Sequence, residues 1–352
     1  MKAVYKVRDG KDGWEIRDIP RREPGENEVE IQIAAAGICG SELHLYHDNH
    51  FYTPPALIGH EWSGRINKVG SNVKNWKVGD KVVVYNSRGA CGQCYFCRKG
   101  QTIFCPNRNT SPYGNKDNGG WREYFTMDTS ALLKVPDHVT YAEAAMIEPL
   151  AITTHALCLK SPIVTGETVL VQGCGTIGML AAMVAKASGA GKVILVGRKS
   201  ARAVRIPVAK KLGMIDLIVD SSQTDLKEVI MELTEGRGAD VVVDCAGSEQ
   251  AINDSISLVR RSGRIIAIGE PPASTVNVKW IDAIVKDLSI VFTFGYLDEA
   301  WMIALKLLAE GKVNMKPMIT HKLPLEKFEE GFKLMDEKIA VKVILLPNGE
   351  MD

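Results

Sequence analysis

The sequence predicts a two-domain α/β protein, in which a β-rich domain is combined with a doubly wound parallel sheet. Three observations support this. Short strand-like segments separated by glycine fill the first part of the chain, strands alternate with helices from about residue 152, and a glycine-rich turn lies at 173–178. We expect domain ranges of 1–151 for the β-rich part, 152–293 for the parallel sheet and 294–352 for a C-terminal return to the first domain.

Composition and charge exclude several functions. The 352 residues suffice for two domains, and 43 basic against 42 acidic side chains give a net charge of +1. This balance, without a Lys/Arg-rich run, argues against nucleic-acid binding. No apolar run reaches membrane-spanning length, and the N-terminus lacks signal-peptide features. We therefore expect a cytoplasmic protein with no nucleic-acid or membrane partner, whose eight cysteines are not disulfide-bonded.

The first 150 residues read mainly as strands and turns. Residues 29–34 alternate with period two, and short strands bounded by glycine follow at 64–70 and 79–84. A helical pattern at 142–159 contains Pro149, where we expect a break.

A candidate catalytic metal site lies near the start of this domain. Cys39 stands in a Gly-Ile-Cys-Gly-Ser segment, and His60 and Glu61 follow a glycine. Thiol, imidazole and carboxylate are ligands that zinc prefers, and Glu148 is the best candidate for the third ligand. Three protein ligands with one open position are typical of a catalytic zinc. The alternative is that Cys39 and His60 are ordinary core residues.

Two further side chains could carry a proton away from whatever binds this metal. Ser41 and His44 lie two and five residues past Cys39. A histidine suits this role because its pKa lies near neutral pH.

Four cysteines predict a second metal site. Their spacing is C-x2-C-x2-C-x7-C, in a lobe at about 89–107, and they are Cys91, Cys94, Cys97 and Cys105. Four thiolates this close match a closed tetrahedral zinc site, which has a structural role. Four free thiols are the alternative, and a redox pair is disfavoured because no βαβ pattern surrounds them.

The glycine-rich turn predicts dinucleotide binding. A buried strand at 167–172 leads into G-x-G-x-x-G and then into a helix at 179–188. The first glycine makes the tight turn, the second lets the backbone approach a pyrophosphate, and the third lets helix and strand pack. The expected contacts are Gly173, Gly175, Thr176, Ile177 and Gly178.

The next strand, at 192–196, indicates which nicotinamide is preferred. An NAD site usually has an acid after this strand, but here Gly197 is followed by Arg198, Lys199 and Arg202, with Arg205 close behind. A glycine leaves room for a 2′-phosphate and arginine supplies a planar cation. We therefore predict NADP(H) rather than NAD(H), the alternative being a solvated basic loop.

Strand–helix alternation continues to residue 293. Strands are expected at 216–220, 240–245, 264–269 and 288–293, and helices at 226–234 and 255–261. Strand ends at the carboxyl edge of the sheet bind ligands, so we add as cofactor contacts Cys245, Ala246, Gly247, Ile268 and Gly269. If the last strand lies at the sheet edge, pairing with a second subunit would cover its backbone, so we expect a homo-oligomer. Helices at 299–310 and 325–335 and a strand at 341–346 complete the chain.

On these motifs the chain resembles the zinc-dependent medium-chain dehydrogenase/reductase (alcohol dehydrogenase) superfamily over essentially its whole length. Within it, the chain is most similar to the polyol (sorbitol-type) and threonine dehydrogenase branch, through Ser41, His44 and Glu148 and through residues 318–326. The resemblance implies a GroES-like catalytic domain split in sequence, a Rossmann domain, a cleft between them, and dimers or tetramers.

The resemblance also bears on individual residues. In some polyol dehydrogenases the Glu61 position binds the metal and the Glu148 position holds only a zinc-bound water, so both remain candidates. Near the end of the chain, Ala-Val-Lys with Lys342 replaces the Gly-Lys that is common in the family. We therefore count Lys342 as a cofactor contact that differs from the family's usual one. The segment from Leu45 to Pro55, where substrate-shaping loops fall, is polar at Tyr46, His47, Asp48, Asn49 and His50, which suits a hydroxyl-rich substrate or a solvated loop.

The expected reaction is reversible oxidation of a secondary alcohol, polyol or sugar-like, to its ketone. Zinc would stabilise the alkoxide, Ser41 would pass the proton through the cofactor ribose to His44, and hydride would go to the nicotinamide. Alternatives are a threonine-type or simple secondary-alcohol dehydrogenase using NAD(H), and a non-catalytic zinc protein that senses dinucleotides.

Overall fold

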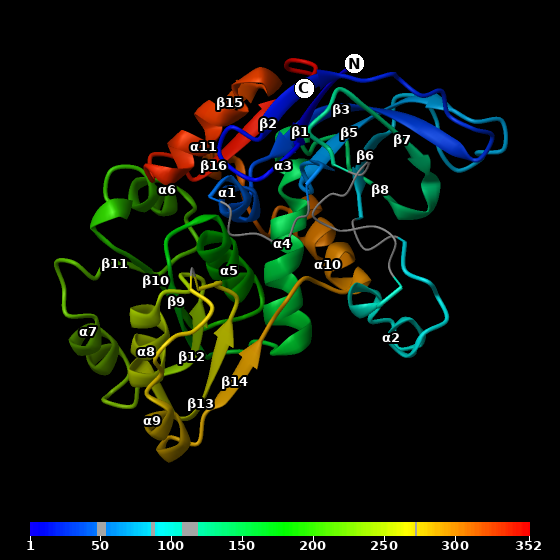
Figure 1. Cartoon of the computed structure of the whole chain (residues 1–352). Helices are drawn as coiled ribbons and strands as arrows, with labels where there is room; N and C mark the ends of the chain where they lie inside the picture. Colours follow the sequence, from blue (N-terminus) through cyan, green and yellow to red (C-terminus); the bar gives the residue numbers. More distant parts are fainter. Residues whose placement is uncertain (48–53, 86–88, 108–118, 272) are drawn as a thin grey trace. The chain divides into compact units, whose positions relative to one another are not determined.

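A computed structural model of the chain describes residues 1–47, 54–85, 89–107, 119–271 and 273–352. They form two compact units, one made of Met1–Glu148 with Ile319–Asp352 and the other of Pro149–Met318 (Figure 1). Along the described parts of the chain, no helix combines the length and apolar character needed to cross a membrane.

The first unit is built on a mostly antiparallel sheet, which confirms the predicted β-rich domain. Its order is β15-β16-β3-β5-β6-β8, and β7 also pairs with β3. The strands are β3 (Glu28–Gly37), β5 (Trp62–Val69), β6 (Lys81–Val84), β7 (Tyr124–Asp128), β8 (Leu132–Lys134), β15 (Ile319–Pro324) and β16 (Lys342–Leu346). A smaller sheet has the order β2-β1-β4, from β1 (Lys2–Lys6), β2 (Trp14–Asp18) and β4 (Ala56–Leu57).

β3 is the central strand of this unit because it pairs with β5, β7 and β16. Short helices pack nearby: α1 (Gly40–Tyr46) follows β3 directly, α3 (Tyr141–Ala145) lies against β3 and β5, and α11 (Phe328–Asp336) contacts α1 and β16. An aromatic cluster joins α1 and α11 to the sheets and consists of Trp14, Tyr46, Trp121, Phe328 and Phe332. β3 is therefore fixed by its three paired strands and by the packing of α3.

The second unit contains the predicted doubly wound parallel sheet, in the order β11-β10-β9-β12-β13-β14. Its strands are β9 (Thr168–Gln172), β10 (Lys192–Gly197), β11 (Leu217–Asp220), β12 (Ala239–Asp244), β13 (Val259–Ala267) and β14 (Ser289–Phe292). The chain first builds outward from β9 to β11 and then from β12 to β14. The order reverses between β9 and β12, and the carboxyl edge at such a reversal is where ligands bind.

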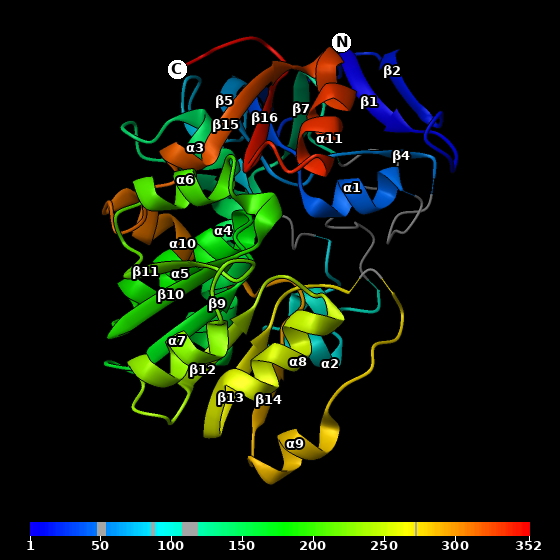
Figure 2. The same cartoon turned by 90° about the vertical axis from the view of Figure 1, so that its left-hand side faces the viewer.

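Helices connect these strands. They are α5 (Thr176–Ala187), α6 (Arg205–Lys211), α7 (Leu226–Leu233), α8 (Glu249–Leu258) and α9 (Trp280–Val285), followed by α10 (Asp298–Ala309). α8 contacts both α7 and α9, so these three lie in series beside the sheet (Figure 2). Among the described residues β14 is the last strand of the sheet on its side, which meets the condition set above for pairing with a second subunit.

Three local predictions were wrong. The helix predicted at 142–159 is interrupted before Pro149 and not at it, between the end of α3 and the start of α4 (Ile147–Thr154). Pro149 lies in the first turn of α4, where a missing N–H costs little. Residues 259–261, expected to be helical, begin β13, because the chain turns directly from α8 into the sheet. α5 begins at Thr176, inside the glycine motif rather than after it.

Candidate metal centre and cofactor site

The ends of two paired strands bring Cys39 and His60 together. β3 and β5 run antiparallel with Ala36 opposite Trp62, and the Gly37 N–H donates to the Glu61 carbonyl oxygen over 2.7 Å. Cys39 lies just past the end of β3 and His60 just before the start of β5, so both fall at the same edge of the sheet. Their proximity follows from the strand register.

Two glycines make room at this edge. Gly59 has a φ of +102°, and a β-carbon there would stand 2.2 Å from the Trp121 ring. Trp121 in turn donates from its indole nitrogen to the Gly37 carbonyl oxygen over 3.1 Å. A β-carbon at Gly37 would collide with the Glu61 carboxylate. Side chains at these glycines would therefore displace the residues around His60.

The possible ligand atoms lie close together. One atom each from Cys39, Glu42 and His60 fall within 4.8 Å of one another, and so do atoms of His60, Glu61 and Glu148. The four non-cysteine residues are buried, and Glu148 enters from the first turn of α4. The four predicted catalytic-zinc residues thus fall in two overlapping groups that share His60, with Cys39 in one and Glu61 and Glu148 in the other.

Glu42 is a member of this cluster that the sequence analysis missed. Its two carboxylate oxygens are both used: Oε2 accepts the Cys39 N–H over 2.8 Å, and Oε1 lies 2.7 Å from His60 Nδ1. This contact orients the imidazole, as carboxylates commonly do around histidine ligands of metals. The available signal was a glutamate three residues after Cys39, where it caps α1.

Lys342 and Glu61 form a buried ion pair beside this cluster. The Lys342 ammonium contacts Glu61 Oε2 and also donates to the Ile38 carbonyl oxygen over 3.0 Å. The other oxygen, Glu61 Oε1, is buried and has no hydrogen-bond partner in the described parts of the chain. Lys342, expected at the cofactor, is thus placed against a carboxylate of the metal cluster.

The electrostatics of the cluster favour a bound cation. Burial raises the pKa of the Cys39 thiol, and the charge of Glu61 raises it further. Burial disfavours a charged His60, but Glu42 and Cys39 outweigh it and raise its pKa. Neighbouring carboxylates raise both pKa values, in addition to the effects of burial. A divalent cation would offset the charge of these carboxylates and would give Glu61 Oε1 a partner, so the donor set fits zinc.

The expected proton-transfer residues lie on α1. Ser41 Oγ is 3.7 Å from Cys39 Sγ, and His44 follows three residues later, on the same face of the helix. His47, at the end of α1, pairs with Asp336 of α11 over 2.8 Å. The other polar residues expected to shape the substrate site, Asp48, Asn49 and His50, lie outside the described residues.

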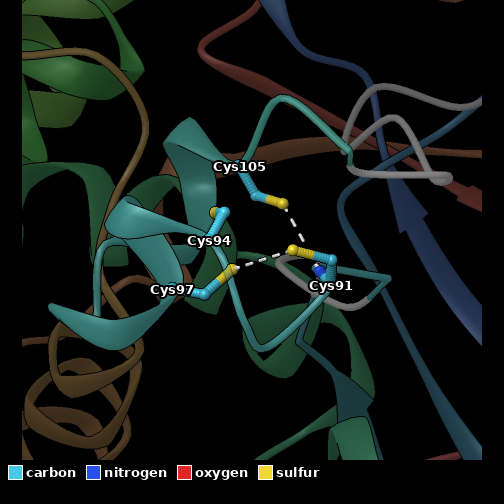
Figure 3. A group of neighbouring side chains, drawn as sticks. All are labelled: Cys91, Cys94, Cys97 and Cys105. Carbon is cyan, nitrogen blue, oxygen red and sulfur yellow. Dashed lines mark hydrogen bonds between the residues drawn. The ribbon is translucent and has the colours of Figure 1, made fainter.

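The four cysteines of the lobe form a second cluster, in which all sulfur atoms lie within 4.8 Å of one another (Figure 3). Cys91 and Cys97 sulfurs are 4.0 Å apart, and the Cys91 N–H points to the Cys105 sulfur over 3.4 Å. Backbone N–H groups of Gln93 and Cys94 lower the pKa of Cys91 to about 6. Burial and neighbouring thiols raise the pKa of Cys97 to about 12. The cluster fits a structural zinc site with four sulfur ligands.

The glycine turn of the second unit is packed so tightly that it needs glycine at its first and last positions. Gly173 has a φ of +108°, and a β-carbon at Gly178 would stand 1.7 Å from the Gly173 carbonyl oxygen. Gly175 precedes the first residue of α5, whose N-terminus attracts anions. At the neighbouring strand ends, a β-carbon at Gly269 would meet the Gly247 nitrogen at 2.4 Å, so only glycine fits.

The basic loop after β10 is partly neutralised. Arg202 forms an ion pair with Asp220 and donates a hydrogen bond from Nη2 to Ser222 Oγ over 3.0 Å. Arg198 Nη2 lies 3.9 Å from Asp254 Oδ2. A β-carbon at Gly197 would meet the Ile206 side chain at 3.1 Å, so an acid at this position would need neighbours to move.

Arg205 is a second residue that was not selected as a cofactor contact. Its Nη1 lies 3.9 Å from the position of a β-carbon on Gly175, so it faces the glycine turn. In the sequence, Arg205 could have been recognised because it belongs to the basic run that begins at Arg198.

Two family models match the chain: the alcohol dehydrogenase GroES-like domain over residues 25–137 and the zinc-binding dehydrogenase over 176–310. The chain is 35% identical to a sorbitol dehydrogenase of Halalkalibacterium halodurans, with 99% of each chain covered. It is also 35% identical to a D-arabitol-phosphate dehydrogenase of Enterococcus avium, covering 99% of this chain and 98% of that one.

Solved structures are similar as well. A zinc-binding dehydrogenase of Sinorhizobium meliloti 1021 bound to NADP has a TM-score of 0.86 at 28% identity, covering 98% of this chain and 99% of that one. A short chain alcohol dehydrogenase of E. coli CFT073 complexed with NADH has a TM-score of 0.84 at 27% identity, with the same coverage of 98% and 99%.

The contacts of Glu42 lead to a first prediction. Glu42→Gln removes the charge that orients His60, so zinc affinity at this cluster should fall by about 10- to 100-fold. Competition with a chromogenic chelator measures this, with the four-cysteine site as internal reference. Glu143→Gln is a matched control, because Glu143 is also a buried capping glutamate, paired with Thr140. Equal zinc affinity in both variants would contradict the role given to Glu42.

Proposed function

The chain belongs to the zinc-dependent alcohol dehydrogenase family, in its polyol and threonine dehydrogenase branch, and on that premise we propose that it oxidises a polyol or sugar-like secondary alcohol to its ketone, preferring NADP. It is an enzyme acting on CH–OH donors that uses zinc and a nicotinamide cofactor. The observation that carries the proposal is that His60 belongs to two groups of possible ligands, one with Cys39 and Glu42 and the other with Glu61 and Glu148.

In this proposal Cys39 and His60 hold the catalytic zinc together with Glu61 or Glu148. Glu42 fixes the His60 ring, and Lys342 holds one oxygen of Glu61 while the other stays free for the metal. When bound, zinc would supply Lewis-acid polarisation of the substrate hydroxyl, and the nicotinamide would accept the hydride.

The residues of α1 handle the proton. Ser41 Oγ lies beside Cys39 and accepts the proton of the substrate hydroxyl, and His44 releases it to solvent. Histidine is a common proton-transfer side chain, so His44 is suited to that last step.

A hydroxyl-rich substrate is supported by the names of two relatives, a sorbitol and a D-arabitol-phosphate dehydrogenase. The competing candidate is threonine, because an L-threonine 3-dehydrogenase of Pyrococcus horikoshii is 34% identical over 98% of both chains. Initial rates with sorbitol, arabitol, threonine and butane-2,3-diol separate these classes. Turnover of threonine alone would remove the polyol assignment.

The metal assignment predicts which variants lose activity. Cys39→Ser and His60→Ala should lower turnover of the best substrate by more than about 100-fold while leaving the fold intact, since each removes a zinc ligand. Circular dichroism and zinc content are measured alongside. Cys158→Ser is the control, because Cys158 is a free cysteine that belongs to neither cluster. Full activity in Cys39→Ser protein that holds only one zinc per chain would refute the assignment.

The preference for NADP is proposed from the loop after β10. The position where an NAD site usually has an acid is Gly197 in this chain. Four basic residues follow it: Arg198, Lys199, Arg202 and Arg205. Arg198 has an exposed side chain that also lines a pocket of about 650 Å³, so it is available to a phosphate.

Arg198→Ala should therefore weaken NADP(H) binding by about 10-fold, the usual cost of one charge-assisted contact, and should leave NAD(H) nearly unchanged. Fluorescence titration of both reduced cofactors measures this. Lys210→Ala, which removes an exposed cation from α6, is the control. Equal affinities of wild-type protein for the two cofactors would contradict the preference.

A homo-oligomer, dimer or tetramer, is proposed from the edge strand β14. No strand in the described parts of the chain pairs with its outer side, and Phe292 at its end is 72% exposed. Such an edge is stabilised when a second copy covers it.

Phe292→Asp should shift the protein to a smaller species in light scattering, because a charge then replaces a buried ring at the interface. Val78→Asp is the control, since Val78 is 59% exposed but belongs to the first unit. A monomeric wild-type protein would exclude this part of the proposal.

A further inference from the structure

A pocket of about 650 Å³ lies in the second unit, lined by residues that follow β10 and β11 and by residues of α8. It combines cations with hydroxyl groups, from Arg198, Lys227, Lys279, Ser221, Ser222 and Thr224. Such a lining suits a phosphorylated ribose, because charge-assisted hydrogen bonds to phosphate are strong. Two acids also line the pocket, Asp225 and Asp254. The Asp225 carboxylate caps α7 by accepting the N–H groups of Lys227 and Glu228. Asp254 instead lies beside Arg198 and does not fit the pattern of a phosphate site.

Asp254 is held in place by two contacts. Its Oδ1 accepts a hydrogen bond from Gln250 Nε2, one turn earlier on α8, over 2.7 Å. Its Oδ2 lies 3.9 Å from Arg198 Nη2. The carboxylate therefore faces the same guanidinium that the proposed NADP preference depends on.

The carboxylate and a 2′-phosphate would compete for Arg198. A phosphate that reached the guanidinium would also come close to the negative charge of Asp254, and like charges repel. The neighbouring Arg202 is similarly engaged by Asp220. NAD carries no 2′-phosphate and would meet neither obstacle.

We propose that Asp254 is a cofactor-selectivity residue that restrains the preference for a 2′-phosphate by engaging Arg198 and opposing the phosphate charge. This rests on the proposed function, because it presupposes that Arg198 faces the 2′-position. The carboxylate then narrows the difference in affinity between NADP(H) and NAD(H), and loss of its charge makes the enzyme more selective for NADP(H).

The test measures binding of 2′,5′-ADP and of 5′-AMP to the full zinc-loaded chain by isothermal titration calorimetry. Asp254→Asn keeps the size of the side chain and should tighten 2′,5′-ADP by about five-fold without changing 5′-AMP. The gain should shrink when Asp254→Asn is combined with Arg198→Ala, because the two residues act on one another. Glu232→Gln, which removes an exposed acid from α7 outside the pocket lining, should change neither ligand.

Unchanged or weaker binding of 2′,5′-ADP by Asp254→Asn overturns the inference, and so does an undiminished gain in the Arg198→Ala background. If Arg198→Ala alone alters neither ligand, the proposed NADP preference fails, and the role of Asp254 fails with it. Selective loss of 2′,5′-ADP in Arg198→Ala, with no response to Asp254→Asn, rejects the inference alone.

Discussion

The antiparallel register of β3 and β5 is the constraint on which the metal centre depends. Pairing of Ala36 with Trp62 places the residue after one strand and the residue before the other at a single edge. β16 pairs with β3 on its other side and delivers Lys342 to the same edge. A slip of one residue would turn side chains to the opposite face, so the sheet fixes the ligands as well as the core.

The residues around the metal centre include several buried ionisable side chains. Glu42, Glu61 and Glu148 are all buried, and the Lys342 ammonium pairs with Glu61. Burying carboxylates costs free energy unless each is paired or coordinates a metal. The site is therefore organised for a cation. In the second unit acids have a different effect, since Asp220 and Asp254 lie at exposed arginines and moderate their charge.

Short-range patterns made much of this predictable. The spacing of the four lobe cysteines and the glycine turn in its strand–helix context each depend on a few neighbouring residues, and the fold class they indicated is confirmed. The contacts that complete the centre are not local. The Lys342–Glu61 pair joins residues 281 positions apart, and no spacing rule indicates it. Asp254 on α8 faces Arg198, the residue after β10, only through the tertiary fold. Pro149 is tolerated because α4 starts two residues before it.

The central claim is that Cys39, His60 and a carboxylate hold a zinc ion separate from that of the four-cysteine lobe. Anomalous diffraction at the zinc absorption edge, from crystals of the full chain, tests this most directly. The account predicts two peaks per chain, one within bonding distance of Cys39 Sγ and His60 Nε2 and one among the four lobe sulfurs. A single peak in the lobe, with Cys39 and His60 bonded only to protein atoms, would contradict it.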